Sequence, residues 1–341
     1  MNKFSVMSWN ILSPQTAARM QYLYKRCKLE NRWPLIVERL LKVSPDILFL
    51  QELEELQFSE LQSVLKEYNG YYVQRPGNID GCGTFLKKKL DIISVKRVNL
   101  SRPDTISNRE NVCMLILAKQ NDEYLILGNT HILYNPKRGL IKAAQIICIF
   151  ENIYKLMQEY DCFDSRIILG GDFNLSPLGL LYHFITQGSL KLNMVPEQLM
   201  SGQLNGNSPR TSLADVNELP NEIFHPFQLK SSYEAVQTVD GKAWKFTQDL
   251  KGKHKFNGLF VDYIFYGHLR QDANLFMKST ALDNKFSPLQ FTADPPALKF
   301  IPSKLELLTI GTLPDPLVEE IQPMPDGIEP SDHFAVYSEF H

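Results

Sequence analysis

Residues 166–174 have the sequence Arg-Ile-Ile-Leu-Gly-Gly-Asp-Phe-Asn. The apolar run Arg166 to Gly171 is typical of a buried strand, and its two glycines allow another part of the chain to approach closely. Asp172 and Asn174 follow the run two residues apart, so on extended chain their side chains face the same way. An Asp after a strand is also a common turn former. Two oxygen-bearing side chains held at a strand end nevertheless predict a site at the edge of a sheet.

The same arrangement, an apolar run with a polar side chain at its end, recurs along the chain. Each instance alone is as well explained by a cap or a turn. Their joint occurrence predicts one shared site, because strand ends hold side chains rigidly at a ligand-accessible edge. The polar residues are Asn10, Glu52, His131, Asp262, Asp332 and His333, beside strands predicted over Phe4 to Asn10, Asp46 to Gln51, Tyr124 to Asn129, Leu259 to Phe265 and Phe334 to Ser338.

Helical patterns alternate with these strands. Apolar residues recur at helical spacing over Trp33 to Lys42, Phe58 to Tyr68 and Leu140 to Tyr160. Only a few polar residues separate Asn111 to Ala118 from Tyr124 to Asn129. That spacing predicts an antiparallel hairpin and excludes an all-parallel sheet. No Gly/Ser-rich linker divides the sequence, so we expect one domain over residues 1–341.

Composition narrows the functional classes. The 341 residues carry a formal charge of -2, which excludes a broadly basic nucleic-acid-binding surface, so any basic contact region must be local. The five cysteines form no metal-type pairing, and no apolar run approaches the ~18 residues of a membrane span. We expect a soluble, cytoplasmic monomer that does not bind membranes.

The ordered set of motifs resembles the endonuclease/exonuclease/phosphatase superfamily. This resemblance implies a four-layer α/β sandwich with two central mixed, mostly antiparallel β-sheets. The motifs that carry it are Trp9-Asn10, Gln51-Glu52, Asn129-Thr130-His131, Gly171-Asp172-Phe173-Asn174, Asp262-Tyr263-Ile264 and Ser331-Asp332-His333.

Segments between the shared motifs resemble one branch of that superfamily. Asp80-Gly81-Cys82 and Arg109 to Val112 are similar to the poly(A)-nuclease-like branch, and Asn129 to Gly139 is similar to the Angel proteins. Leu140 departs from the pattern, since relatives commonly carry an acidic residue there. The resemblance implies hydrolysis of phosphate esters at RNA 3′ ends, with 2′,3′-cyclic phosphate as the expected substrate.

Hydrolysis of a phosphate ester needs a cation to neutralise the phosphate and a base to activate water. The predicted metal ligands are Asn10, Glu52 and Asp332, whose oxygens suit Mg²⁺, with Mn²⁺ as a substitute. The predicted catalytic residues are Asp172 and Asn174 for the water, His131 and His333 for the phosphate oxygens, and Asp262 to orient His333.

Substrate contacts have weaker signals. Residues 241–256 interleave basic side chains with Trp244 and Phe246, as suits stacked bases and phosphates of single-stranded RNA, although a solvated loop explains the pattern equally well. Basic residues also follow His131. The predicted substrate-binding residues are Arg109, Asn111, Lys137, Arg138, Lys142 and Trp244.

Three alternatives remain open at the level of sequence. The same metal site suits a 3′-to-5′ poly(A)-specific exoribonuclease, and less well a DNA-repair nuclease or a lipid or inositol phosphatase. A catalytically silent RNA-binding protein, acting with translation factors as Angel relatives do, is disfavoured because the acidic residues and histidines of the motifs are intact. RNA is the expected partner if the protein hydrolyses phosphate esters at RNA 3′ ends.

Overall fold

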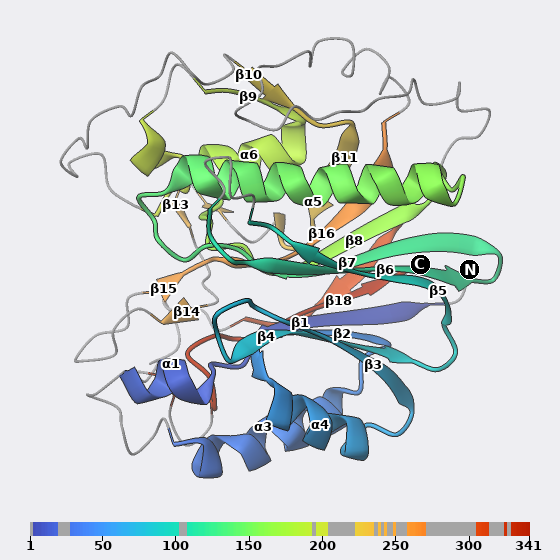
Figure 1. The fold of residues 1–341 in the computed structure, drawn as a ribbon, viewed down its shortest axis with the longest axis vertical. Helices are drawn as coiled ribbons and strands as arrows, with labels where there is room; N and C mark the ends of the chain where they lie inside the picture. The colour runs from blue at the N-terminus through green and yellow to red at the C-terminus, as the bar shows by residue number, and fades with distance from the viewer. Residues whose placement is uncertain are drawn as a thin grey trace.

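Two six-stranded β-sheets pack against each other between two layers of helices (Figure 1). This computed structural model confirms the predicted four-layer α/β sandwich. It describes residues 3–19, 28–101, 108–192, 196–203, 222–234, 238–239, 242–243, 248–249, 258–270, 305–313, 324–325 and 329–341.

The first sheet contains both ends of the chain. Its strand order is β17-β18-β1-β2-β4-β3, and β1 and β2 are its one parallel pair. β1 lies in the middle because its apolar residues are buried on both faces of the sheet. The strands are β1 (Phe4–Asn10), β2 (Ile47–Glu54), β3 (Tyr68–Gln74), β4 (Asp80–Lys87), β17 (Leu307–Ile310) and β18 (Val336–Phe340).

The second sheet repeats this plan with the order β11-β16-β8-β7-β6-β5, and here β7 and β8 are the parallel pair. The predicted hairpin is confirmed as antiparallel β6 and β7. The strands are β5 (Asp91–Asn99), β6 (Val112–Gln120), β7 (Glu123–His131), β8 (Arg166–Asp172), β11 (Phe227–Ser231) and β16 (Asp262–Leu269).

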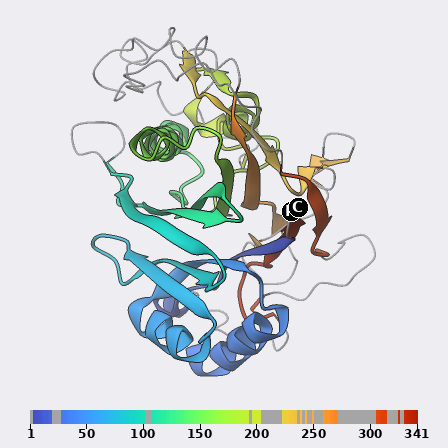
Figure 2. The same cartoon turned by 90° about the vertical axis from the view of Figure 1, so that its right-hand side faces the viewer.

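Helices cover the outer faces of both sheets. α3 (Leu29–Val43) and α4 (Glu55–Val64) lie on the first sheet, and α5 (Gly139–Glu159) and α6 (Leu180–Gln187) lie on the second. Figure 2 views α5 nearly end-on, with the blue helices on the opposite side of the sheets. Smaller elements are α1 (Pro14–Arg19), a 3₁₀ turn (Glu197–Leu199), and the strand pairs β9 (Ser189–Lys191) with β10 (Glu222–Phe224), β12 (Thr238–Val239) with β13 (Lys242–Ala243), and β14 (Gln248–Asp249) with β15 (Gly258–Leu259).

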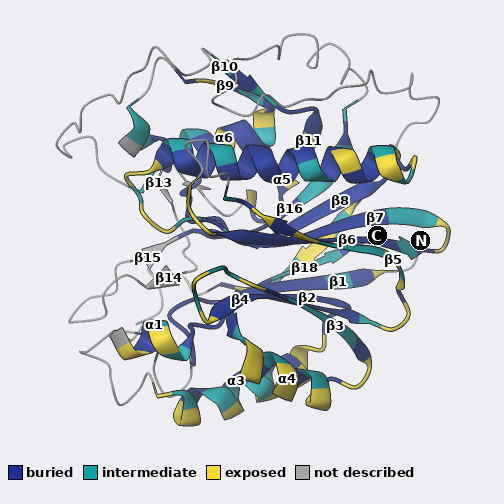
Figure 3. Ribbon diagram, viewed as in Figure 1, coloured by how far each residue is buried: buried dark blue, intermediate teal, exposed yellow. Residues whose placement is uncertain are grey.

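The main hydrophobic core lies between the two sheets, and Figure 3 shows the strands of both sheets as largely buried. A Cβ atom on Gly170 would come within 2.3 Å of the Phe49 ring, so glycine lets the sheets approach there. The core also holds a polar bridge. Gln51 Nε2 donates to Asn129 Oδ1 at 2.8 Å, and Asn129 Nδ2 donates to Gly83 O at 2.8 Å. Buried hydrogen-bonded pairs of this kind fix how the two sheets align.

Some predicted bounds differ from the structure, and some elements were not predicted. The helix expected to run to Tyr68 ends at Val64, because Tyr68 begins β3 and its buried hydroxyl donates to Pro45 O at 2.6 Å. The strand expected to begin at Leu259 begins at Asp262. β3, β4 and β5 were not predicted, since they carry glycines, exposed faces or charged residues that weaken the apolar pattern.

Helix length and hydropathy bear on membrane insertion. Across the described ranges, no helix combines the length and apolar character needed to span a bilayer.

Candidate active site

The ends of five strands bring the predicted carboxylates and histidines together. Parallel pairing of β7 with β8 aligns His131 with Asp172, and antiparallel pairing of β8 with β16 aligns Asp172 with Asp262. Asp262 therefore lies at the start of β16 and not at the end of its strand as expected, and Asp332 and His333 likewise precede β18. Because β16 runs opposite to β8, its beginning meets the end of β8.

Asn10 joins the two sheets at the site. Its Nδ2 donates to Glu52 Oε1 at 3.0 Å and to Asp172 Oδ2 at 3.1 Å. Its Oδ1 accepts the Leu12 N–H at 3.0 Å. In this orientation the amide nitrogen bridges the two carboxylates, while the amide oxygen is hydrogen-bonded to the backbone.

Glu52 owes its position to an irregularity in β2. The register with β4 shifts between Gln51 and Leu53, and the Glu52 backbone lies in the left-handed region with φ of 56°. A bulge of this kind turns one side chain out of the regular alternation. Burial opposes ionisation of Glu52, but His131, the Asn10 amide, the Ser13 N–H and His333 together hold its pKa below the ordinary value.

His333 is held as a cation by the carboxylates around it. Its Nδ1 contacts Asp262 Oδ2 at 2.8 Å, and its Nε2 lies 3.9 Å from oxygens of Asp172 and of Asp332. Burial disfavours the charge, but Asp262, Asp332 and Asp172 outweigh it and raise the pKa to about 10. The ring therefore presents a protonated Nε2 at neutral pH. His131 Nε2 contacts the same oxygen of Asp172, Oδ2, at 3.4 Å.

The surroundings of Asp332 disfavour its charged form. Burial and the nearby Glu52 raise its pKa to about 7, although His333 and Arg32 act to lower it. A carboxyl group that ionises near neutrality when buried is suited to receive a cation.

The donor set fits a hard divalent cation. Glu52 and Asp172 each accept a hydrogen bond from Asn10 Nδ2, and Asp172 and Asp332 each place an oxygen 3.9 Å from His333 Nε2. Asp332 Oδ1 and Asn174 Oδ1 are buried without a hydrogen-bond partner among the described residues. Mg²⁺ prefers such oxygen ligands and retains several waters. Ligand atoms of Asp172, Asp262 and His333 also lie within 4.8 Å of one another, but His333 Nδ1 already bonds Asp262, so that trio better suits hydrogen-bonded orientation of the ring.

Asn174 is supported from behind by a buried lysine. Its backbone N–H donates to Asp172 Oδ1 at 2.9 Å, and its Nδ2 donates to Ile132 O at 3.1 Å. Lys142 Nζ donates to Asn174 O at 2.6 Å and to Gln203 Oε1 at 2.8 Å. Lys142 is fully buried, and burial lowers its pKa to about 7 against the opposing effect of Asp172. We expected Lys142 to contact substrate phosphates; the structure instead buries its amine against Asn174 O and Gln203 Oε1.

Asn111 is likewise behind the site. Its Nδ2 donates to His131 O at 2.9 Å, and its Oδ1 accepts Gln145 Nε2 at 2.9 Å, so its contacts orient the strand that carries His131. The side chains of Arg109, Lys137 and Arg138 are exposed. Trp244 lies outside the described residues, as do the lysines at 251, 253 and 255.

Sequence reasoning missed the residues that hold the loops of the site. The buried Arg32 donates to Ile11 O, Leu12 O and Pro330 O, which ties the loop after Asn10 to the one before Asp332. Ser331 Oγ donates to Asn10 O at 2.6 Å. An arginine within an amphipathic helix has no sequence signal for burial. The serine lies in a motif that the resemblance already marked.

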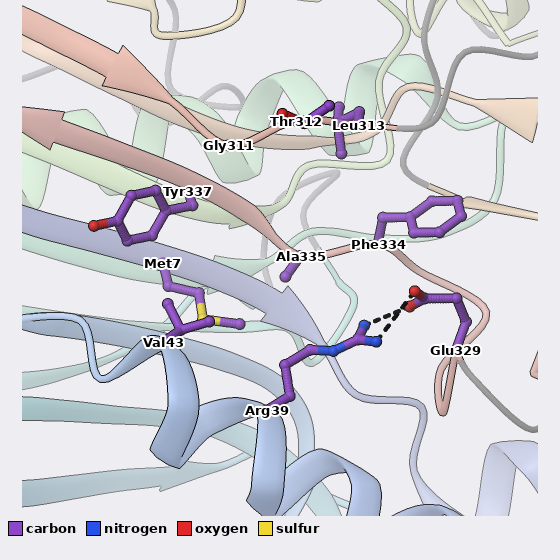
Figure 4. Close-up of a pocket in the computed structure, with 10 residues that line it drawn as sticks. All are labelled: Met7, Arg39, Val43, Gly311, Thr312, Leu313, Glu329, Phe334, Ala335 and Tyr337. Atoms are coloured by element: carbon purple, nitrogen blue, oxygen red, sulfur yellow. Dashed lines mark hydrogen bonds and ion pairs between the residues drawn. The ribbon is translucent and has the colours of Figure 1, made fainter.

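A cavity of about 510 Å³ lies apart from these residues, on the outer side of the first sheet (Figure 4). Met7, Arg39 and Tyr337 are among its lining residues, and Arg39 pairs there with Glu329 at 2.5 Å. None of the predicted site residues lines it. The candidate active site is therefore the carboxylate and histidine cluster at the strand ends.

Comparisons with known proteins agree with the fold. Protein angel homolog 2 of Danio rerio is 27% identical over 99% of this chain and 64% of its own length. The human protein of that name is 34% identical over 59% of this chain and 40% of its own. The chain thus spans less than two thirds of the length of these relatives. Carbon catabolite repressor protein 4 homolog 3 of Arabidopsis thaliana is 29% identical over 71% of the chain and 55% of its own length.

Solved structures show the same relationship. A crystal structure of ANGEL2, described as a 2′,3′-cyclic phosphatase in complex with adenosine-2′,3′-vanadate, matches with a TM-score of 0.77 and 27% identity over 99% of this chain and 95% of that one. The human Nocturnin catalytic domain shares the fold with a TM-score of 0.60 at 19% identity, over 99% of this chain and 93% of its own. The model of the Endonuclease/Exonuclease/phosphatase family matches residues 7–333, and the chain belongs to this family.

Proposed function

We propose that this protein is a divalent-metal-dependent phosphoesterase that removes 2′,3′-cyclic phosphate from RNA 3′ ends. The observation that carries the proposal is the cluster of Glu52, Asp172 and Asp332 with two histidines, in a chain that matches a 2′,3′-cyclic phosphatase over 99% of its length. Such a cluster supplies both groups that hydrolysis of a phosphate ester needs, a cation site and a base.

Glu52 and Asp332 would hold Mg²⁺, with Mn²⁺ as a substitute, and the Asn10 amide would fix the distance between Glu52 and Asp172. When bound, the cation neutralises phosphate charge and favours deprotonation of a water. As oriented, Asn10 donates to the carboxylates, so it would ligate the cation itself only after its amide turned over.

The protein side chains would carry out the proton transfers. Asp172 accepts the proton of the attacking water, which Asn174 Oδ1 positions. The new bond forms between the water oxygen and phosphorus, and the bond to one ribose oxygen breaks. That oxygen leaves as a hydroxyl with a proton taken from the solvent, to which Asp172 returns the proton it accepted. Protonated His333 donates to the non-bridging oxygens, where negative charge grows in the transition state, and His131 donates to them through a ring N–H. Asp262 fixes the ring of His333 through Nδ1.

Complete removal of the phosphate needs two such hydrolyses. The first opens the ring and leaves a phosphomonoester on one hydroxyl, and the second releases inorganic phosphate. Both steps place charge on oxygens of the same phosphorus, so one set of donors serves both.

The test is a set of matched RNAs that end in 2′,3′-cyclic phosphate, 2′-phosphate, 3′-phosphate or an oligo(A) hydroxyl. We expect loss of the cyclic phosphate without shortening of the RNA, and no activity in excess EDTA. The similarity to carbon catabolite repressor protein 4 homologues favours a second candidate, a 3′-to-5′ poly(A)-specific exoribonuclease. A ladder of shortened oligo(A), with cyclic ends untouched, would establish that candidate and overturn the first.

A further inference from the structure

An exposed aromatic ring lies three residues beyond His131. Tyr134 is 57% exposed, and among the large apolar side chains that are exposed in the described ranges it is the one aromatic. It belongs to the loop between β7 and α5, the segment that also carries the exposed Lys137 and Arg138. In proteins that bind single-stranded RNA, aromatic rings stack on bases and basic side chains contact phosphates, and this loop offers both kinds of side chain.

Hydrogen bonds hold the backbone on both sides of Tyr134. Ile132 N donates to Asp172 O at 2.9 Å, and Leu133 N donates to Gln145 Oε1 at 3.0 Å. Beyond the ring, Pro136 O accepts Ser201 Oγ at 2.9 Å. The ring is therefore presented from a fixed backbone, which lowers the entropy lost when a ligand stacks on it.

Charges of the site act on the phenol of Tyr134. Partial burial raises the pKa of Tyr134, and the charges of Asp332 and Asp172 raise it further. These two carboxylates reach the site from different sheets, and electrostatic effects of this kind fade with distance. Ile132 N, two residues before the ring, bonds the carbonyl of Asp172, so the loop that carries Tyr134 leaves β7 beside the carboxylate cluster, and the Tyr134 side chain is largely exposed there.

We propose that Tyr134 is a stacking platform for the nucleobase of the terminal nucleotide whose phosphate lies among Asp172, Asp332 and the two histidines. The inference rests on the proposed function and adds its substrate class: the enzyme acts on a phosphate that belongs to a base-bearing nucleotide. Since every base has a π-face, stacking selects for a nucleobase without selecting among the four.

The experiment compares three variants on two RNAs with a terminal 2′,3′-cyclic phosphate. The RNAs are identical except that one carries adenine on the last ribose and the other is abasic there. Tyr134→Ala removes the ring, and Tyr134→Phe keeps it without the hydroxyl. Leu41→Ala truncates a side chain of similar exposure, 51%, on α3 and serves as the control.

For Tyr134→Ala we expect kcat/KM on the adenine-ended RNA to fall about 5- to 150-fold, mainly through KM, since a stacked base is worth ~1–3 kcal/mol. On the abasic RNA the same variant should match the wild type. Tyr134→Phe and Leu41→Ala should match the wild type on both.

Equal losses on the two RNAs, or no loss on either, would overturn the stacking role. A protein inactive on both RNAs before any substitution would instead contradict the proposed function, so the two failures are distinguishable. Circular dichroism of Tyr134→Ala, with a melting temperature like that of Leu41→Ala, excludes misfolding as the cause of a base-dependent loss.

Discussion

Asn174 shows how much support a single site residue receives. Its backbone lies in the left-handed region with φ of 47°, an unfavourable conformation for a residue with a side chain. Its backbone N–H donates to Asp172, and its side-chain amide nitrogen donates to Ile132 O. Its backbone carbonyl accepts a hydrogen bond from Lys142. Of the polar atoms of Asn174, these contacts leave only Oδ1 without a hydrogen-bond partner among the described residues, and Oδ1 is the atom assigned to the attacking water.

Replacement of Lys142 tests that support. Lys142→Met keeps the chain length but leaves the carbonyl of Asn174 buried without its donor. We expect the free energy of unfolding in urea to fall by about 1–3 kcal/mol and kcat to fall with it, while KM for RNA changes little. Lys137→Met, in the exposed loop that precedes α5, should leave stability unchanged. A variant with the stability loss but wild-type kcat would make Lys142 purely structural.

The pair of His333 and Asp262 predicts a pH dependence of stability. Because the folded pKa of His333 is about 10 and its ordinary value is 6.5, its stabilising contribution is complete below about pH 6.5. The contribution is lost as the pH rises to about 10. Asp262→Asn should therefore reduce the free energy of unfolding at pH 6.5 by about 1.5–3 kcal/mol, and the two proteins should converge toward pH 10.

Urea titrations in EDTA across this range measure the difference without bound cations. A constant difference between the variant and the wild type at every pH would show that the substitution disturbs packing and not the charge on His333.

At the scale of elements, strand register decides which side chains meet. A shift of one residue between β7 and β8 would turn Asp172 away from His131, because side chains alternate along a strand. Gly171 protects this register. Its φ is 148°, and a Cβ atom there would lie 1.9 Å from Thr130 O on the neighbouring strand.

Gly171→Ala should consequently force β7 and β8 apart and abolish activity, with a stability loss of about 3 kcal/mol or more. Gly77→Ala is the matched control, because Gly77 also has a positive φ, 67°, but meets only the flexible end of Glu110. Its cost should stay near 1 kcal/mol with activity intact. Thermal melting and turnover of both variants decide the matter, and an active Gly171→Ala protein would refute the role given to this strand pair.

The sequence predicted the buried strands and the polar residues at their ends, because apolar runs and motif residues are local signals. It did not predict β3 and β5, whose residues are partly exposed, or β4, which is buried but has its apolar run interrupted by Gly81 and Gly83. It also placed Lys142 and Asn111 at the substrate, since nothing in a local pattern separates a cation that faces solvent from one buried against a carbonyl. The bulge at Glu52 and the burial of Arg32 depend on contacts between segments far apart in the chain.

At the scale of the molecule, the site exists only where the two sheets meet. Asn10, Glu52 and Asp332 come from the first sheet and its loops, and the remaining acidic residues come from the second. The Gln51 and Asn129 bridge fixes the sheets against each other a short way behind the site. Packing of the two sheets thus brings several carboxylates close together at their interface. A bound cation should stabilise the whole fold because it offsets the repulsion between these carboxylates.

Mg²⁺ should therefore raise the melting temperature, and more at pH 8 than at pH 6. Without metal, the pKa of Asp332 is about 7, so about one tenth of these side chains is ionised at pH 6 and most are ionised at pH 8. Binding requires the ionised carboxylate and competes with its proton, so the apparent affinity should be about tenfold weaker at pH 6. At subsaturating Mg²⁺ the weaker binding gives a smaller gain in unfolding free energy.

Differential scanning calorimetry at matched ionic strength, with KCl in place of MgCl₂ as the reference, isolates this effect from general screening. Asp332→Asn is the matched variant, because it keeps the shape of the side chain but cannot lose a proton. It should melt higher than the wild type in EDTA at pH 8, since a buried negative charge is gone, and gain little from Mg²⁺ at either pH. Equal Mg²⁺-dependent shifts at pH 6 and pH 8 in the wild type would remove Asp332 from the metal site and leave Glu52 as its anchoring carboxylate.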